Sequence, residues 1–331
     1  MSQFQLYPLK FKPILKHYLW GGGNLKQLFP EKISASESVA ESWEISDIGE
    51  DVSIVVNGGL AGTSLRDLLK TRGAEILGKE NVSQSKGSFP LLIKLIDAED
   101  QLSIQVHPDD GYAKRSEAGK RGKTEMWYLL HTSKRAKLYC GFQSGVTRDQ
   151  FLKAQKRDRY EELLQSYATQ PGDVFFVPAG TIHSIGKGNI LFEVQVASDL
   201  TYRLYDWGRV DKKTGNPRPT HLEKSNAVIL FENPQAGKVL TKVLEKTKSF
   251  LKEELVHCPY FKVDKWTVDK SAEEKIDGKF RIYCMTRGKG EFVSNASVVS
   301  FQAGDTFLIP AALEKVQIKS NQTVEFLNVT V

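Results

Sequence analysis

Five side chains suited to metal binding or proton transfer lie in three short segments of the sequence. Gln105 and His107 are two residues apart, as are Lys123 and Glu125, and His183 follows some sixty residues later. Because alternate side chains of a strand project to the same face, both pairs predict strands whose ligands converge on one ion. The candidate metal ligands are Gln105, His107, Glu125 and His183. They supply two imidazole nitrogens and two oxygens, which suits Zn²⁺ and is tolerated by Mn²⁺, Fe²⁺ or Co²⁺.

Taken one at a time, these residues also fit other roles. Gln105 and His107 fit the end of a strand before Pro108, Glu125 fits a surface carboxylate, and His183 fits a turn. The prediction of a metal site therefore depends on their combination.

His183 ends a segment with regularly placed turn residues. Gly172-Asp-Val-Phe-Phe-Val-Pro-Ala-Gly-Thr-Ile-His183 resembles the second sequence motif of the cupin superfamily. Gly and Pro shape tight turns around a short strand in that motif. The resemblance implies that His183 points into a small β-barrel. The first cupin motif usually contains a His-x-His pair, whereas this chain has Gln105 and His107, with Glu125 further along.

This departure from the usual cupin pattern matches one family. The chain up to about residue 230 resembles type I mannose-6-phosphate isomerases in their short bacterial form. The segments that carry the resemblance are Phe11-Lys-Pro, Trp20-Gly-Gly, Glu41-Ser-Trp-Glu-Ile-Ser46, Phe89-Pro-Leu-Leu-Ile-Lys94, Gln105-Val-His-Pro108, Gly122-Lys-Thr-Glu125, Pro178-Ala-Gly-Thr-Ile-His183 and Tyr202-Arg-Leu-Tyr-Asp-Trp-Gly-Arg209. The resemblance implies an enzyme that interconverts mannose 6-phosphate and fructose 6-phosphate through a cis-enediol, with one Zn²⁺ per chain.

Such an isomerase needs an electrophile, an acid–base group and a group that holds the phosphate. A bound metal stabilises negative charge on the C1 or C2 oxygen of the sugar, or orients these oxygens. Lys123 shares a predicted face with Glu125, so it either moves protons beside the ion or stays charged and holds a substrate oxygen. Glu193 is a second candidate base, or else a partner that orients Lys94 or Arg203.

Arg203 is the main candidate for substrate binding. The family resemblance implies that it is an active-site arginine, and a planar guanidinium grips phosphate or enediolate oxygens with paired hydrogen bonds. The alternative is a structural arginine paired with Asp206 or Asp199. Arg209 and Lys94 are further candidates for substrate binding.

The composition excludes several other classes of protein. The 46 basic residues are interspersed with 40 acidic ones, and the net charge of +6 therefore favours a small anionic substrate over nucleic acid. No apolar run reaches the roughly 18 residues of a membrane span, and the N-terminal sequence lacks the pattern of a secretory signal. We therefore expect no membrane partner and a cytoplasmic location. The cysteines, Cys140, Cys258 and Cys284, are too few and too scattered for a disulfide framework.

Short stretches rich in Val, Ile, Phe and Tyr predict many strands. They lie within residues 35–60, 88–142, 171–207 and 256–331. Helical patterns begin at Ser64, Thr147 and Thr220. The expected fold class is mainly β, with two cupin-type jelly-roll barrels and a few helices packed outside them.

A composition break at residues 233–237 predicts two domains. Residues 1–235 would form the metal-binding catalytic domain and residues 236–331 a C-terminal cupin-like domain. The long loop 208–219 is expected to be exposed and to border the site.

An internal repeat supports a duplicated barrel, although a chance similarity between hairpins is the alternative. Residues 304–315 repeat the spacing of residues 172–183, with Ala312 at the position of a turn glycine and Lys315 at the position of His183. Because an ammonium group cannot ligate a cation, we expect the second barrel to hold no metal.

Two other functions fit parts of the pattern. One is a cupin dioxygenase in which His107, Glu125 and His183 hold iron, and the other is a non-catalytic bicupin that binds sugar. The cationic residues Lys123 and Arg203 favour an anionic sugar over an aromatic diol. The expected partner is thus a small sugar phosphate, and the protein is expected to be a monomer or a homodimer.

Overall fold

The computed structural model describes residues 5–33, 38–211, 215–295 and 297–331. Its contacts divide the chain into two compact units. The central unit comprises Leu15–Trp43 and Leu91–Val239, and the terminal unit comprises Met1–Ile14, Glu44–Pro90 and Leu240–Val331. The predicted boundary near residue 236 lies close to the last of these junctions. The predicted domains were continuous, however, whereas two N-terminal segments group with the C-terminal residues. The assignment of catalysis and metal binding to one domain alone stays a prediction.

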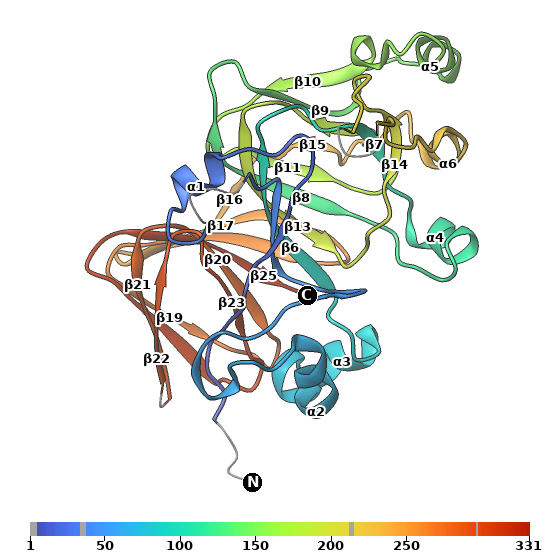
Figure 1. Cartoon of the computed structure of the whole chain (residues 1–331). Coiled ribbons are helices and arrows are strands. Elements are labelled where there is room, and N and C mark those ends of the chain that lie inside the picture. The colour runs from blue at the N-terminus through green and yellow to red at the C-terminus, as the bar shows by residue number, and fades with distance from the viewer. Residues whose placement is uncertain (1–4, 34–37, 212–214, 296) are drawn as a thin grey trace. The chain divides into compact units, whose positions relative to one another are not determined.

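The central unit contains a five-stranded and a seven-stranded sheet, and the prediction of a mainly β fold is confirmed (Figure 1). The five-stranded sheet has the order β10-β9-β12-β7-β14 and the seven-stranded sheet the order β15-β11-β8-β13-β6-β3-β2. The strands are β2 (Ile14–Lys16), β3 (Glu41–Ile45), β6 (Leu91–Ala98), β7 (Ile104–Val106), β8 (Glu125–Thr132), β9 (Lys137–Phe142), β10 (Leu164–Ala168), β11 (Val174–Val177), β12 (His183–Ile185), β13 (Asn189–Val196), β14 (Tyr202–Tyr205) and β15 (Gly237–Lys238).

The central unit has two groups of buried apolar residues. One group includes Trp127, Leu191 and Phe175 from adjacent antiparallel strands of the seven-stranded sheet. The other includes Val106 on β7 of the five-stranded sheet and Phe151 on the helix Arg148–Gln155. Because β6 and β13 are buried along their whole lengths, charged residues on these strands must find partners inside the protein.

The helices of the described residues are α1 (Asn24–Leu28), α2 (Leu65–Leu77), α3 (Lys79–Ser85), α4 (Asp110–Ser116), α5 (Arg148–Gln155) and α6 (Leu222–Val228), with short 3₁₀ turns at Gly58–Leu60 and Tyr160–Glu162. Three of them, α2, α5 and α6, begin near the starts that the sequence predicts, and the other three, α1, α3 and α4, were not predicted. Ser64 caps α2 through the amide of Asp67, and Thr147 forms a capping box with Gln150 at α5. The third helix begins at Leu222 rather than at Thr220. None of the helices in the described ranges is long and apolar enough to cross a membrane.

The terminal unit is also built from antiparallel strands. A seven-stranded sheet has the order β1-β23-β20-β25-β18-β17-β16, a four-stranded sheet has the order β19-β24-β21-β22, and β4 pairs with β5. The strands are β1 (Leu9–Lys10), β4 (Asp47–Ile48), β5 (Asp51–Val52), β16 (Lys242–Lys246), β17 (Phe250–His257), β18 (Lys262–Val268), β19 (Ser271–Lys275), β20 (Arg281–Arg287), β21 (Lys289–Ser294), β22 (Ser297–Gln302), β23 (Thr306–Ile309), β24 (Lys315–Lys319) and β25 (Val324–Thr330).

Aromatic rings fill the space between the two larger sheets of the terminal unit. The ring of Tyr283 lies 5.4 Å from that of Phe292 and 4.9 Å from that of Phe326. Lys315, the counterpart of His183 in the repeat, is exposed and pairs with Glu273 at 2.9 Å. The position that carries a buried imidazole in the central unit therefore carries a solvated ammonium in this one.

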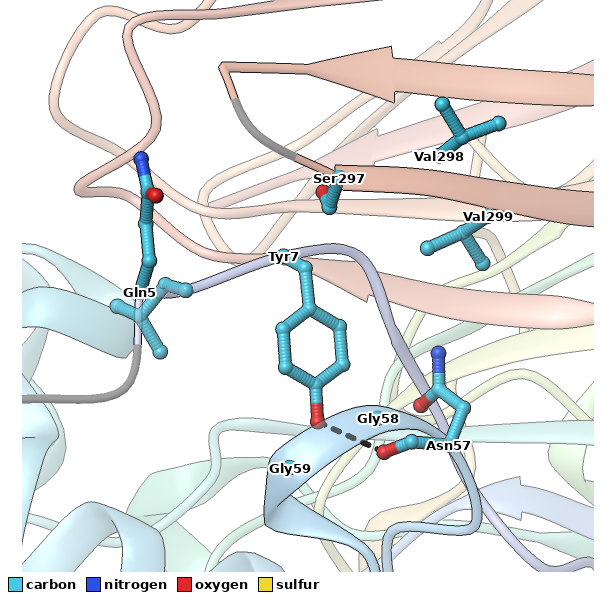
Figure 2. Close-up of a pocket in the computed structure, with 9 residues that line it drawn as sticks. Gln5, Tyr7, Asn57, Gly58, Gly59, Ser297, Val298 and Val299 are labelled. Carbon is cyan, nitrogen blue, oxygen red and sulfur yellow. Dashed lines mark hydrogen bonds between the residues drawn. The ribbon is translucent and has the colours of Figure 1, made fainter.

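A cavity of about 540 Å³ in the terminal unit lies beside Tyr7, Asn57 and Val298 (Figure 2). The hydroxyl of Tyr7 donates to the carbonyl of Asn57 at 2.7 Å and accepts from the amide of Leu60. The side chain of Asn57 bonds the backbone of Lys10 and Pro8. These polar groups thus bond the backbone of neighbouring segments, and the described residues that line the cavity form no cluster of groups for catalysis.

A buried polar network joins three strands of the terminal unit. The carboxylate of Glu274 accepts hydrogen bonds from Arg281 Nε at 3.0 Å, Tyr283 Oη at 2.5 Å and Asn328 Nδ2 at 2.8 Å. Burial, followed by the charge of Glu274, raises the pKa of Tyr283, so the phenol stays a donor.

Replacing Glu274 by Ala should lower the free energy of unfolding by about 3–5 kcal/mol, because it leaves the buried Arg281 guanidinium without its main partner. Urea denaturation measures the loss. The neighbouring Glu273→Ala is the matched control, because its exposed pair with Lys315 should contribute no more than about 1 kcal/mol. Equal losses in the two variants would contradict a structural role for the network.

Candidate active site

A cavity of about 330 Å³ in the central unit collects most of the predicted site residues. Its walls include Lys94, Gln105, Lys123, Glu193 and Arg203. These residues come from β6, β7, β13 and β14 and from the turn that precedes β8. Four of these five side chains are charged, and all but Lys123 lie on strands.

Three of the four predicted ligands meet at one point beneath this cavity. His107 Nε2 lies 3.5 Å and His183 Nε2 lies 3.4 Å from the two carboxylate oxygens of Glu125. The candidate ligand atoms all lie within 4.8 Å of one another, and the three side chains are almost fully buried. The convergence follows from strand pairing, because β12 pairs with β7 so that His183 lies opposite Gln105. His107 follows β7 directly and Glu125 opens β8.

Both imidazoles are held in the form that binds metals. The Nδ1 atom of His107 lies 2.8 Å from the carbonyl oxygen of Leu200, and that of His183 lies 2.8 Å from the carbonyl oxygen of Thr181. These bonds place the proton on Nδ1 and turn the lone pair of Nε2 toward Glu125. Burial lowers the pKa of His107 well below its usual value and that of His183 to about 4. Both rings are therefore neutral at pH 7.

The ligand atoms fit a cation. In the part of the chain that the structure describes, His107 Nε2 and Glu125 Oε1 are buried without a hydrogen-bond partner, whereas Glu125 Oε2 lies 2.8 Å from the ammonium group of Lys123. Burial, followed by the charge of Glu193, raises the pKa of Glu125 to about 7. Two neutral nitrogen lone pairs and a buried carboxylate are the donor set that a divalent ion satisfies.

Gln105, the fourth predicted ligand, lies next to His183. Its Nε2 lies 3.2 Å from His183 Nε2, and its Oε1 accepts from Ser103 Oγ at 3.2 Å. A half-turn of the amide exchanges its nitrogen and its oxygen. That exchange would direct the carbonyl oxygen, the atom that can bind a cation, toward His183.

A row of alternating charges leads from the ligands along the cavity wall. The order is Glu125, Lys123, Glu193, Lys94 and Glu41. The nitrogen–oxygen distances between successive members are 2.8, 4.0, 2.9 and 3.5 Å. Strand register sets the central pair, because Lys94 on β6 lies opposite Glu193 on β13. Each ammonium group thus lies between two carboxylates.

Glu193 fits the role of a positioning partner better than that of a base. It accepts from Lys94 Nζ at 2.9 Å and from Trp127 Nε1 at 3.0 Å. Burial opposes ionisation, but the charges of Lys94 and Lys123 outweigh it and lower the pKa of Glu193 to about 2. A carboxylate with this pKa has little affinity for a proton at pH 7. Burial likewise disfavours the charge on Lys94, but Glu193 and Glu41 outweigh it and raise the pKa of Lys94.

Arg203 lines the cavity and is not held by the acids that the sequence suggested as structural partners. Asp206 binds two other arginines, and Asp199 pairs with Lys120 at 3.0 Å. Arg203 Nη1 donates to the carbonyl of Pro219 at 2.9 Å, while its Nε is buried with no hydrogen-bond partner among the described residues. Burial, followed by the charge of Arg218, lowers the pKa of Arg203.

The structure adds residues that the sequence did not single out. Glu41, Trp43 and Arg218 line the cavity, and Trp43 Nε1 donates to Glu41 at 2.6 Å. Glu41 and Trp43 are two residues apart on β3, so the alternation of side chains along a strand would have predicted that both face the same side. Arg218 lies in the loop that was expected to border the site, of which residues 212–214 lie outside the described part. Arg209 binds Asp206 and does not line the cavity, so its role in substrate binding stays a prediction.

Comparisons with known proteins point to one family. Residues 8–128 match the model of the type I phosphomannose isomerase catalytic domain, and residues 252–328 match that of the mannose-6-phosphate isomerase cupin domain. The chain is 37% identical to the mannose-6-phosphate isomerase ManA of Bacillus subtilis over 94% of this chain and 96% of that protein. It is 32% identical to the mannose-6-phosphate isomerase of Streptococcus mutans, over 94% of each. The crystal structure of the mannose 6-phosphate isomerase from Bacillus subtilis superposes with a TM-score of 0.89 at 32% identity, covering 98% of this chain and 99% of that one.

His183→Ala should weaken binding of a divalent ion by more than ~100-fold, because loss of a mere supporting partner of a ligand already costs about 10- to 100-fold. Equilibrium dialysis against Zn²⁺ measures the affinity. His131→Ala, on the exposed part of β8, is the control and should bind as the unmodified protein does. Unchanged affinity in His183→Ala would rule out this residue as a ligand.

Proposed function

This chain belongs to the type I mannose-6-phosphate isomerase family of aldose–ketose isomerases, and we propose that it acts through one Zn²⁺ per chain and a cis-enediol form of the sugar. The observation that carries the proposal is the buried group of His107, Glu125 and His183, in which His107 Nε2 and Glu125 Oε1 have no hydrogen-bond partner among the described residues. Its substrate class, a sugar phosphate, agrees with the four cationic side chains on the cavity wall. These are Lys94, Lys123, Arg203 and Arg218.

Zinc suits the proposed ligands better than the harder cations do. Two imidazoles, one carboxylate and the amide of Gln105 form a mixed nitrogen and oxygen set, whereas Mg²⁺ and Ca²⁺ prefer oxygen alone. When bound, the ion would act as a Lewis acid toward the oxygens on C1 and C2 of the sugar. Because Gln105 is neutral, Glu125 supplies the only ligand charge, and the site keeps a net positive charge.

The reaction moves a proton between two carbons. Going from mannose 6-phosphate, a base removes the proton on C2 and an acid returns a proton to C1, while the hydroxyl proton on O2 is released and O1 gains one. Lys123 lines the cavity 2.8 Å from Glu125, so its amine lies beside the proposed ion and can exchange protons with the sugar oxygens or hold them. Both roles that the sequence left open for Lys123 remain within this proposal.

The other charged residues hold and orient the substrate. Glu193 and Glu41 fix Lys94 in one position, so that its ammonium group faces the cavity as a permanent positive charge. Arg203 offers Nε, a buried donor that lacks a partner, to a phosphate or enediolate oxygen. A cytoplasmic location and the choice between monomer and homodimer stay predictions.

Lys123→Ala should lower kcat by about 10²- to 10⁴-fold, the usual contribution of a positioned acid–base group, while the protein keeps its zinc. A coupled assay on mannose 6-phosphate and metal analysis of the same sample measure the two quantities. Lys114→Ala, on the exposed face of α4, is the control and should retain full activity. A non-catalytic sugar-binding protein would have no turnover to lose in either variant.

Removal of the metal by a chelator should abolish isomerase activity, because the ligand atoms then surround no electrophile. Stoichiometric Zn²⁺ should restore the activity, and circular dichroism should show that the metal-free protein remains folded. Full activity after complete removal of the metal would disprove the metal-dependent mechanism.

A further inference from the structure

Asp206 binds two arginines beside the catalytic cavity. It follows β14 directly, and its side chain is 6% exposed. Its Oδ2 accepts from Arg218 Nε at 2.7 Å, and its Oδ1 accepts from Arg218 Nη2 and Arg209 Nη2, each at 2.5 Å. Burial opposes the charge of Asp206, but hydrogen bonds from Arg218 and Arg209 outweigh it and lower its pKa. Arg218 is therefore gripped along one edge of its guanidinium group.

The segment that carries Arg218 is docked on β14 at a second place. Arg203 Nη1 donates to the carbonyl of Pro219, the amide of Arg203 donates to His221 Nδ1, and the amide of His221 donates to the carbonyl of Arg203. Arg203 and Arg218 consequently line the same cavity, although fifteen positions separate them in the chain. Asp206 accepts hydrogen bonds from Nε and Nη2 of Arg218, so Nη1 is the nitrogen that can donate to a ligand.

The two groups of charged residues differ in their charge balance. The row next to the metal ligands contains Glu41, Glu125 and Glu193 but only two ammonium groups, so its net charge is negative without an ion. The cluster around Asp206 contains three guanidinium groups and one buried carboxylate. A phosphate monoester carries a charge of about −1.5 to −2 at pH 7. Arg203 and Arg218 line the cavity, whereas Arg209 and Asp206 do not, and Asp199, which also lines it, pairs with Lys120. The guanidinium groups of Arg203 and Arg218 are thus the positive charge that the cavity offers to a phosphate on this side.

We propose that Asp206 is a positioning residue: by holding Arg218, it forms with Arg203 a two-arginine subsite for the phosphate group of the substrate. The proposal rests on the proposed function only for the identity of the sugar, because the subsite should bind any small phosphate. Asp206 touches neither the substrate nor the ion and acts through Arg218. Two planar guanidinium groups can bond several phosphate oxygens at once, which fixes the direction of the bound sugar chain.

The test compares Asp206→Asn, Arg218→Ala and the double variant. Each single change should raise both KM for mannose 6-phosphate and the inhibition constant of inorganic phosphate by about 10- to 100-fold, the effect of losing hydrogen bonds to a charged group. The value of kcat should change by less than about threefold, and zinc content should not change. In the Arg218→Ala background, Asp206→Asn should have no further effect, because the residue through which it acts is gone.

Asp100→Asn is the matched control, because Asp100 is exposed and lies 3.6 Å from Arg209 rather than beside Arg218. It should leave KM and the phosphate inhibition constant unchanged. If Asp206→Asn does not fold, Arg218→Lys replaces it in the test. The lysine keeps the positive charge but cannot form the paired hydrogen bonds with Asp206, so this variant should also weaken phosphate binding.

Unchanged phosphate inhibition in Asp206→Asn, or an additive effect in the double variant, would overturn the proposal while leaving the isomerase assignment intact. Failure of the proposed function has a different signature. The unmodified protein would then show no metal-dependent isomerase activity, while phosphate binding measured by calorimetry would still respond to Arg218→Ala.

Discussion

The central constraint on this protein is the burial of the Glu125 carboxylate between two neutral imidazoles. Among the described residues its Oε1 has no hydrogen-bond partner and its Oε2 lies 2.8 Å from Lys123 Nζ, and the rings of His107 and His183 turn lone pairs toward it. A buried charge in such surroundings is costly unless a counter-charge accompanies it. The ammonium group of Lys123 supplies one counter-charge, and the group of His107, Glu125 and His183 has the geometry to hold a metal ion as a second.

The charged residues around this centre form two groups with different tasks. Near the ligands, carboxylates and ammonium groups alternate, and each lysine is fixed by the acids beside it. Around Asp206, positive charge exceeds negative charge. In the proposed function, the first group would face the carbon atoms and oxygens that react, and the second would bind the phosphate.

Local patterns were sufficient to predict much of the site. The spacing of Gln105 with His107 and of Lys123 with Glu125 predicted ligands that converge on one ion, and strand pairing does bring His183 opposite Gln105. The caps at Ser64 and Thr147 were equally readable, because a capping side chain bonds a backbone group only a few residues away. These features depend on short stretches of chain.

Other features depend on contacts between distant segments and have no local signal. Residues 44–90 group with the C-terminal strands, which composition along the chain cannot indicate. Arg218 lies in a loop without periodicity, and only its bonds with Asp206 reveal where it points. The role of Glu193 was left open because its partner, Lys94, is set by the register of β6 and β13.

Anomalous diffraction at the zinc absorption edge, from crystals of the protein loaded with Zn²⁺, tests the central claim most directly. The account predicts a single strong peak within coordination distance of His107 Nε2, His183 Nε2, a carboxylate oxygen of Glu125 and the amide oxygen of Gln105, at ~2.0–2.2 Å from the nitrogen and carboxylate ligands. A loaded crystal with no peak between these side chains, or with its zinc bound elsewhere, would contradict it.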